Sequence, residues 1–395
     1  METAAFALTA LVAAILQSGP PSSASPPRDL RERVVRTYAE HCHRLYVECE
    51  RLAGELDVAI SALLERPDAE TLAVARRAWI AARAVYVRTE ALRFYDGPVD
   101  AIEGYLNAWP VDEAFIDYVE GAPASGIVND AVHYPRLGET VLMFANEHGG
   151  EANICVGWHA IEFLLWGQDL RADGPGDRPV ADYVLDVDGD GDGGVGRNAT
   201  RRREYLQIAT RLLRRQLGEL ASAWAPDADN YRRRFEADPE TAVRKILTGV
   251  TILTAFELTG ERLAVAYETQ DQEQEHSCFS DTTGQDFEAD QLGIVRVVRG
   301  EPAADRPGIL ALVALSDAAL ARALDAQLDR TLTALRAIPQ PFDVAMRGAD
   351  DAPGRVAIRQ ALEALEQQAE LLTFAGSALG FELPLQPATV RGGGR

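Results

Sequence analysis

The sequence predicts an all-α protein in which two helical bundles pack side by side. Apolar side chains recur at three-and-four spacing over nearly every long segment, which is the period of an amphipathic helix. No stretch shows the strict alternation of a half-buried strand or the strand–helix rhythm of a parallel sheet. A long loop rich in Gly and Asp separates two halves of similar outline, and two packed bundles are the economical arrangement for them.

The first half opens with two long helices. Helical spacing predicts one helix over 29–64, and a break at a Pro precedes a second over 69–94. Residues 98–150 scatter Gly, Pro and Asn among short helical pieces. The segment GWHAIEFLLWG, 157–167, then forms a helix that is apolar on nearly every side.

The second half contains the longer run of helices. Periodicity predicts helices over 200–223, 239–274, 309–337 and 353–378, with an irregular stretch at 276–308. The chain therefore divides into a signal-like segment with its linker, an N-terminal bundle that includes helix 157–167, an acidic Gly-rich loop, a C-terminal bundle and a disordered tail. Their ranges are 1–28, 29–170, 171–199, 200–385 and 386–395.

The chain is strongly acidic. Its 395 residues include 61 Asp and Glu against 39 Lys and Arg, a formal net charge of −22. This balance argues against nucleic acid and anionic membranes as partners, and it suits cations or simple solubility. The stretch DVDGDGDGG at 186–194 opens like a calcium-binding loop. Arg197 stands where such a loop needs a bidentate Glu, so we expect a solvated acidic loop there.

The N-terminus resembles a secretory signal. An apolar run at 4–16 is followed by a small, Pro- and Ser-rich stretch, with cleavage expected around Ala24, although no Lys or Arg precedes the run. The run is short for a membrane span, and no later stretch would cross a membrane, so we expect an exported mature chain without a transmembrane span. A bridge between Cys155 and Cys278 and separate buried thiols are both compatible with the sequence.

The apolar helix 157–167 carries two groups that it should exclude. His159 and Glu162 stand three residues apart, which places them on one helix face. A buried carboxylate without partners is costly, and a metal ion held by imidazole and carboxylate would remove that cost. A buried His–Glu hydrogen bond, or a salt bridge to an arginine, would remove it equally well.

Further acidic residues follow the helix 69–94. Spacing of seven and eleven residues places Trp79, Arg83, Tyr86 and Glu90 on one face, which indicates a helix that looks into a polar pocket. Asp100 and Glu103 follow the turn after this helix. Solvated helix ends are the ordinary interpretation of such acids.

Four stretches together resemble the imelysin-like family of bacterial envelope proteins. They are GWHAIEFLLWGQDL with its GxHxxE pattern, RTEALRFYDGPVD, LNAWPVDEAFIDYV at 106–119, and AFELTGERLAVAYETQDQEQEHSCFSD at 255–281. The resemblance implies two helical bundles with a cleft between them, export to the periplasm or envelope, and a link to iron uptake. Similar sequences often read SDNTH where this chain has SDTTG, so a site role for that loop is in doubt.

The resemblance also implies a metal site. Carried over to this sequence, the metal ligands would be His159, Glu162, Glu90 and Asp100, with iron as the expected metal and zinc as an alternative. An envelope iron-transport system would be the partner. A second group of residues would line the cleft or support the ligands: Arg93, Glu103, Asp112, Glu257 and Arg262. For His276 we expect a solvated loop position, and for Asp112 the first turn of a short helix.

Three functions remain open from the sequence. The first is an extracytoplasmic metal-binding protein that serves iron acquisition. The second is a metallopeptidase using the same site, although the HExxH pattern is absent and HAIE supplies one imidazole only. The third is an envelope interaction module without metal, in which His159 is a satisfied core residue. The binding protein ranks above the peptidase because no general base separate from the ligands is evident.

Overall fold

The structure is a computed structural model that describes residues 26–185 and 198–387, and its regular secondary structure is almost entirely helical. The predicted all-α class is confirmed, because the described residues contain one sheet of only two short antiparallel strands, β1 (Gly300–Glu301) and β2 (Arg306–Pro307). The signal-like segment, the calcium-like loop at 186–194 and the last eight residues of the tail lie outside the described residues.

Two long helices begin the described chain, as predicted. Helix α2 (Arg28–Glu65) buries a continuous apolar stripe and ends two residues before Pro67. Helix α3 (Ala69–Tyr86) starts at a capping box, in which Asp68 and Thr71 satisfy each other's backbone amides. The predicted helix 69–94 tightens after Tyr86 into the 3₁₀ turn η1 (Val87–Leu92). This tighter turn carries Glu90.

The middle of the chain consists of short pieces around one buried helix, as the scattered Gly, Pro and Asn indicated. The short elements are α4 (Glu103–Leu106), α5 (Glu113–Ile116), α6 (Glu139–Ala145) and η2 (Val180–Tyr183). Helix α7 (Gly157–Trp166) has every residue buried. It packs against α3 and α8 (Ala199–Ala223).

The predicted helix 239–274 is continuous over most of its length but changes its winding. It runs through α10 (Pro239–Ile252), the π-helical segment η3 (Leu253–Ala264) and α11 (Val265–Thr269). Helix α9 (Tyr231–Ala237) precedes it, and the 3₁₀ turn η4 (Gln272–Gln274) follows. π-Helical segments are rare and occur frequently at functional sites; here the segment carries Glu257 and Arg262.

One expectation for the C-terminal half was wrong. The stretch 276–308 is not irregular throughout, because it contains helix α12 (Thr283–Arg299). Thr282 caps this helix and Thr283 and Gly284 begin it, all of which favour a loop in the sequence, although its later residues have apolar helical spacing. The predicted helix 309–337 divides at Asp317, whose side chain caps the second part. The remaining helices are α13 (Ile309–Ser316), α14 (Ala318–Arg336), α15 (Phe342–Met346) and α16 (Pro353–Ala378).

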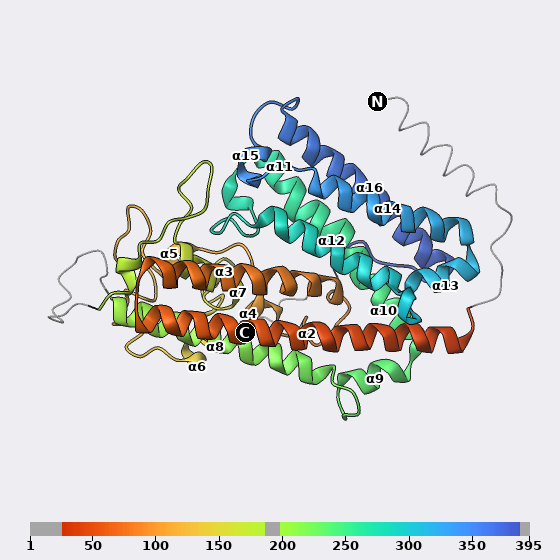
Figure 1. Cartoon of the computed structure of the whole chain (residues 1–395), viewed down its shortest axis with the longest axis horizontal. Helices are drawn as coiled ribbons and strands as arrows, with labels where there is room; N and C mark the ends of the chain where they lie inside the picture. The colour runs from red at the N-terminus through yellow and green to blue at the C-terminus, as the bar shows by residue number, and fades with distance from the viewer. Residues whose placement is uncertain (1–25, 186–197, 388–395) are drawn as a thin grey trace.

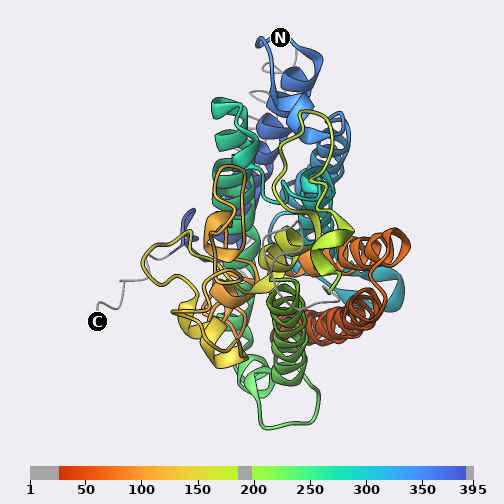
Figure 2. The same ribbon diagram turned by 90° about the vertical axis from the view of Figure 1, so that its left-hand side faces the viewer.

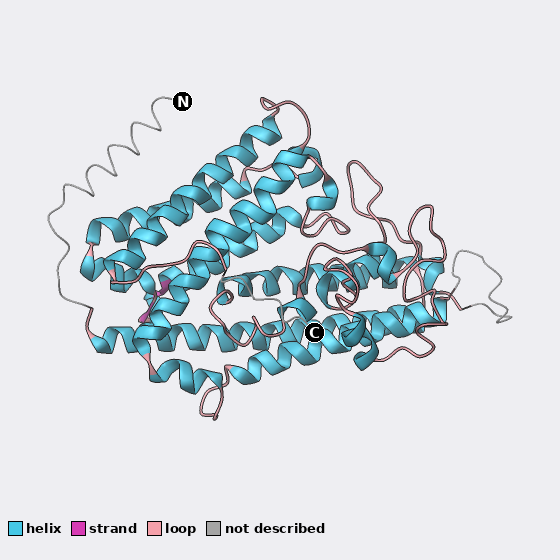
Figure 3. Ribbon diagram, turned by 180° about the vertical axis from the view of Figure 1, so that it is seen from behind, coloured by secondary structure: helices cyan, strands magenta, loops and turns pink. Residues whose placement is uncertain are grey.

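The long helices lie in two groups (Figure 1). Helices α2, α3 and α8 form the lower layer of that view, while α12, α14 and α16 form the upper layer. Figure 2, turned by 90°, shows α7 between the long helices, and Figure 3 shows the two strands small beside them. The main hydrophobic core runs from Val34 to Leu379 and so draws on both groups, and a second cluster lies around Leu258, Phe342 and Leu365.

The packing of α8 bears on the expected domain boundary. Although α8 follows the predicted linker, it packs against α2 and α7 of the N-terminal half. The predicted boundary between two bundles at 171–199 therefore stays a prediction. Within the described residues, no helix has the length and apolar character needed to cross a bilayer.

Candidate functional site

The site begins with the glycine that starts α7. Gly157 has φ +85°, a conformation that side chains other than glycine rarely adopt. A Cβ atom at this position would lie 2.4 Å from the carbonyl oxygen of Leu106. Glycine therefore allows α7 to begin in contact with the end of α4, and this entry fixes the direction in which His159 and Glu162 point.

His159 and Glu162 contact each other in the interior. Nδ1 of His159 lies 2.8 Å from Oε2 of Glu162, and both side chains are 0% exposed. The other carboxylate oxygen, Oε1, accepts hydrogen bonds from the amide (3.0 Å) and hydroxyl (2.6 Å) of Ser280. Burial raises the pKa of Glu162 to about 8, and burial together with the Arg83 guanidinium lowers the pKa of His159 well below its usual value. The imidazole is therefore neutral at physiological pH.

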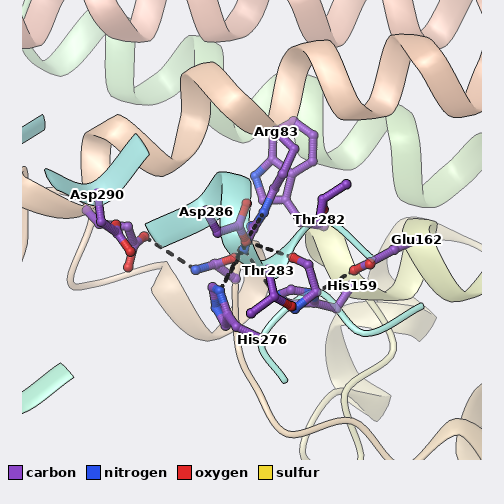
Figure 4. Close-up of polar contacts among 12 residues, drawn as sticks. Arg83, His159, Glu162, His276, Thr282, Thr283, Asp286 and Asp290 are labelled. Carbon is purple, nitrogen blue, oxygen red and sulfur yellow. Dashed lines mark hydrogen bonds and ion pairs between the residues drawn. The ribbon is translucent and has the colours of Figure 1, made fainter. Parts of the chain in front are cut away.

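A guanidinium occupies the centre of the site (Figure 4). Nη2 of Arg83 lies 2.9 Å from Oδ2 of Asp286, 3.1 Å from Nδ1 of His276 and 3.5 Å from Nε2 of His159. Nη1 of Arg83 donates to the side-chain oxygen of Asn107. Arg83 comes from α3, His159 from α7, and Asp286 from α12, so one buried cation joins three helices.

A second arginine continues the network from the π-helical segment. Arg262 donates to Asp290 at 2.7 Å, to Glu90 at 2.8 Å and to Glu257 at 2.9 Å. Burial works against ionisation of Glu90, but Arg93 and Arg262 together hold its pKa below the usual range. Arg262 is 4% exposed and Glu90 is 0% exposed, so this cluster too is shielded from water.

Two side chains connect the parts of this network. Asn107 donates to Glu90 at 3.3 Å and accepts from Arg83, which links the two arginine clusters. Arg93 contacts Glu90 and lies 3.2 Å from Glu103. We call the whole set, with the Ser280 that binds Glu162, the central polar seam: Arg83, Glu90, Arg93, Glu103, Asn107, His159, Glu162, Glu257, Arg262, His276, Ser280, Asp286 and Asp290.

The donor arrangement of the central polar seam does not fit a metal ion. The ring nitrogens His159 Nε2 and His276 Nδ1, which could ligate a metal together, both face Nη2 of Arg83. Over residues 26–185 and 198–387, no three His, Cys, Asp or Glu side chains converge as a metal site would need. Oδ1 of Asp286 and Oδ1 of Asp290 are buried without a hydrogen-bond partner, so carboxylate oxygen remains in excess even beside the arginines.

Comparison with known proteins identifies the family. The profile of the imelysin family matches residues 44–372, which is most of the chain. The chain belongs to the imelysin family. No protein among the curated sequences matches it.

A solved structure shares the fold of this chain. The crystal structure of a putative iron-regulated protein A precursor from Parabacteroides distasonis ATCC 8503 superposes with a TM-score of 0.69 at 17% sequence identity. The match covers 91% of this chain and 97% of that chain. At this identity the likeness establishes the fold.

The structure places most of the predicted site residues in the central polar seam. His159, Glu162, Glu90, Arg93, Glu103, Glu257 and Arg262 all belong to it. Asp100 instead accepts hydrogen bonds from three backbone amides, those of Phe94 (2.9 Å), Tyr95 (3.2 Å) and Gly97 (2.8 Å). Asp112 caps α5 through the amide of Ala114 at 3.1 Å, as expected for an acid at a helix start.

Sequence reasoning missed the residues that complete the seam. His276 was expected in solvent but is 5% exposed and lies with its ring centroid 4.9 Å from that of His159. The loop with SDTTG was placed in doubt, yet Ser280 binds Glu162 directly. Asp286 and Asp290 stand four residues apart on α12, and this spacing could have marked an acidic helix face had α12 been predicted.

The cysteines take no part in this site. Cys42, Cys49, Cys155 and Cys278 are all buried and free. Burial raises the pKa of each thiol, most moderately that of Cys155, to about 12. They behave as small core side chains rather than as nucleophiles.

Proposed function

We propose that this imelysin-family protein is a non-enzymatic protein of iron acquisition that works outside the cytoplasm and holds no free metal ion in the central polar seam. Family membership and the fold shared with an iron-regulated protein precursor support the link to iron. The acidic net charge of −22 suits a protein that meets cations rather than nucleic acid. The N-terminal apolar run followed by a Pro- and Ser-rich stretch supports export.

The observation that carries the non-enzymatic assignment is the position of Arg83. A catalytic zinc site needs three protein ligands, an open coordination position and a polarised water. Here the imidazole nitrogen that a metal would use lies 3.5 Å from a guanidinium nitrogen, and the motif glutamate is held by His159 and Ser280. The positive charge that this acidic interior needs comes from the chain itself.

The central polar seam then holds the two helical groups together. Its ion pairs join α3 to α12 through Arg83 and Asp286, and η1 to the π-helical segment through Glu90 and Arg262. Fully satisfied buried polar networks rigidify a core. This one is satisfied at its ion pairs, while Oδ1 of Asp286 and Oδ1 of Asp290 lack a hydrogen-bond partner. The metal set of His159, Glu162, Glu90 and Asp100 stays a prediction that this donor arrangement argues against.

Metal titration of the purified protein tests this proposal. We would titrate Fe²⁺, Fe³⁺ and Zn²⁺ into the wild type, His159→Ala and Glu90→Ala, and measure bound metal after gel filtration. The expected result is no stoichiometric metal that depends on either side chain. One metal ion per chain that is lost in both variants, with the fold intact by circular dichroism, would overturn the proposal.

A digestion assay tests the peptidase alternative. Casein and insulin would be incubated with the wild type and with His159→Ala, with and without chelator. We expect no cleavage that follows the protein through purification. Chelator-sensitive cleavage that disappears in His159→Ala would establish a peptidase instead.

A further inference from the structure

A surface groove lies between α5 and α6. It is open to solvent, unlike the buried central polar seam. Its volume is about 910 Å³, and its walls come from α5, the loop 124–134 and the α6 segment through His148. Pockets of roughly 300–1,000 Å³ accommodate cofactor-sized ligands. The lining is mostly apolar, with two imidazoles and a phenol among the side chains: His133, His148 and Tyr134.

One of these imidazoles is oriented as metal-binding imidazoles are. Nδ1 of His133 lies 2.7 Å from Oδ2 of Asp130. The carboxylate is itself fixed, since its Oδ1 accepts from the amides of Val132 (3.2 Å) and His133 (2.9 Å). A carboxylate that accepts from one ring nitrogen fixes the tautomer and the ring orientation, which is the common arrangement behind a ligating histidine. The His133 side chain is 79% exposed, so its other nitrogen is accessible to a ligand. Nε2 of His133 is thereby prepared to bind a metal.

The α6 wall of the groove offers a flat aromatic surface. Phe144 is 79% exposed, and its ring stacks on His148 with centroids 5.9 Å apart at an interplanar angle of 26°. Leaving so large an apolar ring in water is costly, and exposed apolar surface that lines a groove marks a place where a ligand or partner binds. A stacked pair of rings suits a planar, aromatic ligand.

The small number of side chains that could ligate a metal limits which forms of a metal this groove can bind. A free ion needs several protein ligands, and no three His, Cys, Asp or Glu side chains converge anywhere in the described ranges, 26–185 and 198–387. A metal that arrives with its own equatorial ligands needs only one or two axial donors. Iron in a porphyrin is such a metal, and histidine is its commonest axial ligand.

We propose that the groove between α5 and α6 binds an iron porphyrin, with Nε2 of His133 as the axial ligand and Phe144 packed on the macrocycle face. Arg136 follows Tyr134, a residue of the groove lining, by two positions, and it is exposed outside the lining itself. It makes no ion pair with any other described residue, so it is available to carboxylates of a porphyrin that extends beyond the groove. The proposal takes from the proposed function only the choice of iron as the metal; it requires no metal in the seam.

Absorbance titration with haemin tests the groove directly. The wild type should bind one haemin per chain with a shifted Soret band. His133→Ala removes the axial ligand and should weaken haemin binding at least tenfold. Asp130→Asn removes the carboxylate that orients His133 and should weaken haemin binding by about tenfold. Phe144→Ser should also weaken binding, whereas Val58→Ser, at a site that is 70% exposed on α2, should not.

Two further measurements distinguish ligation of the iron by His133 from nonspecific hydrophobic adsorption of the porphyrin. They also distinguish binding in the groove from binding in the central polar seam. Metal-free protoporphyrin should bind at least tenfold more weakly than haemin to the wild type, and His133→Ala should remove that difference. His159→Ala should bind haemin as the wild type does. The absence of saturable haemin binding, or equal affinity of the wild type and His133→Ala, would overturn the proposal, and neither result would affect the assignment of the seam.

Discussion

Arg83 and Asp286 form an ion pair in the interior, with Nη2 and Oδ2 2.9 Å apart and each side chain 1% exposed. The pair joins α3 to α12, which are separated by about half of the chain. The same guanidinium nitrogen lies within 3.5 Å of both imidazoles of the seam. Arg83 thus joins the two helical groups at the centre of the seam.

Loss of Arg83 should destabilise the fold strongly. Arg83→Met leaves Asp286 as an uncompensated buried charge, and breaking a buried ion pair costs about 3–5 kcal/mol. Urea unfolding followed by circular dichroism measures this cost. The double variant Arg83→Met, Asp286→Asn should regain a large part of the lost stability, because it no longer buries a lone charge. Equal instability of the single and double variants would contradict the pairing.

The glycine of the GxHxxE pattern should be required for its backbone conformation. Gly157→Ala places a Cβ at φ +85° and 2.4 Å from a carbonyl oxygen, and holding a non-glycine residue in such a conformation alone costs about 1–3 kcal/mol. Thermal unfolding should show a clear drop in Tm. Gly260→Ala is the matched control, since nothing lies within 4 Å of its added Cβ. A similar Tm for the two variants would show that the contact with α4 does not matter.

The bond from Ser280 to Glu162 should contribute measurably to stability. Ser280→Ala removes the hydroxyl that donates to Oε1 at 2.6 Å, and a buried acceptor left without this partner costs about 1–3 kcal/mol. Ser222→Ala is the control, because its hydroxyl bonds only to a carbonyl of its own helix at an exposed position. A double-mutant cycle with Glu162→Gln should give a coupling free energy. Zero coupling would remove the SDTTG loop from the seam.

Glu275 should make the protein less stable as pH rises. Glu275 is 1% exposed and neither carboxylate oxygen has a partner of good hydrogen-bond geometry. Burial raises its pKa to about 9; the nearby Thr283 hydroxyl opposes this effect, and Asp343 and Asp281 add to it. Since the pKa is higher in the folded state, the stabilising contribution is complete below the unfolded pKa of about 4.3 and is lost as pH rises towards the folded value. The loss is up to about 1.4 kcal/mol per pH unit between these values.

Urea unfolding of Glu275→Gln at pH 5 and pH 8 checks this dependence. The variant stays neutral, so it should gain stability relative to the wild type at pH 8 and gain little at pH 5. Glu370→Gln, at an exposed position on α16, should change little at either pH. A constant difference between Glu275→Gln and the wild type over this range would contradict the raised pKa.

The sequence by itself determined the helical class, the places of the long helices and the unusual character of α7. These follow from local information: apolar period, capping residues such as Asp68, and breaks at Pro and Gly. The family was also evident from the sequence, because its motifs are contiguous stretches. Helix α12 was missed since its first turn carries Thr and Gly, which local preference assigns to loops.

Only the tertiary structure decided what compensates His159 and Glu162. The sequence left a metal, a hydrogen bond and an arginine open, because each would satisfy a buried imidazole and carboxylate equally well. The answer depends on which distant side chain reaches the gap, and Arg83 and His276 come from segments 193 residues apart. Such a meeting is set by how helices pack, which no local pattern records. In this structure His159 and Glu162 contact each other, Ser280 donates to Glu162, and the Arg83 guanidinium lies beside the imidazole, while the metal set stays a prediction.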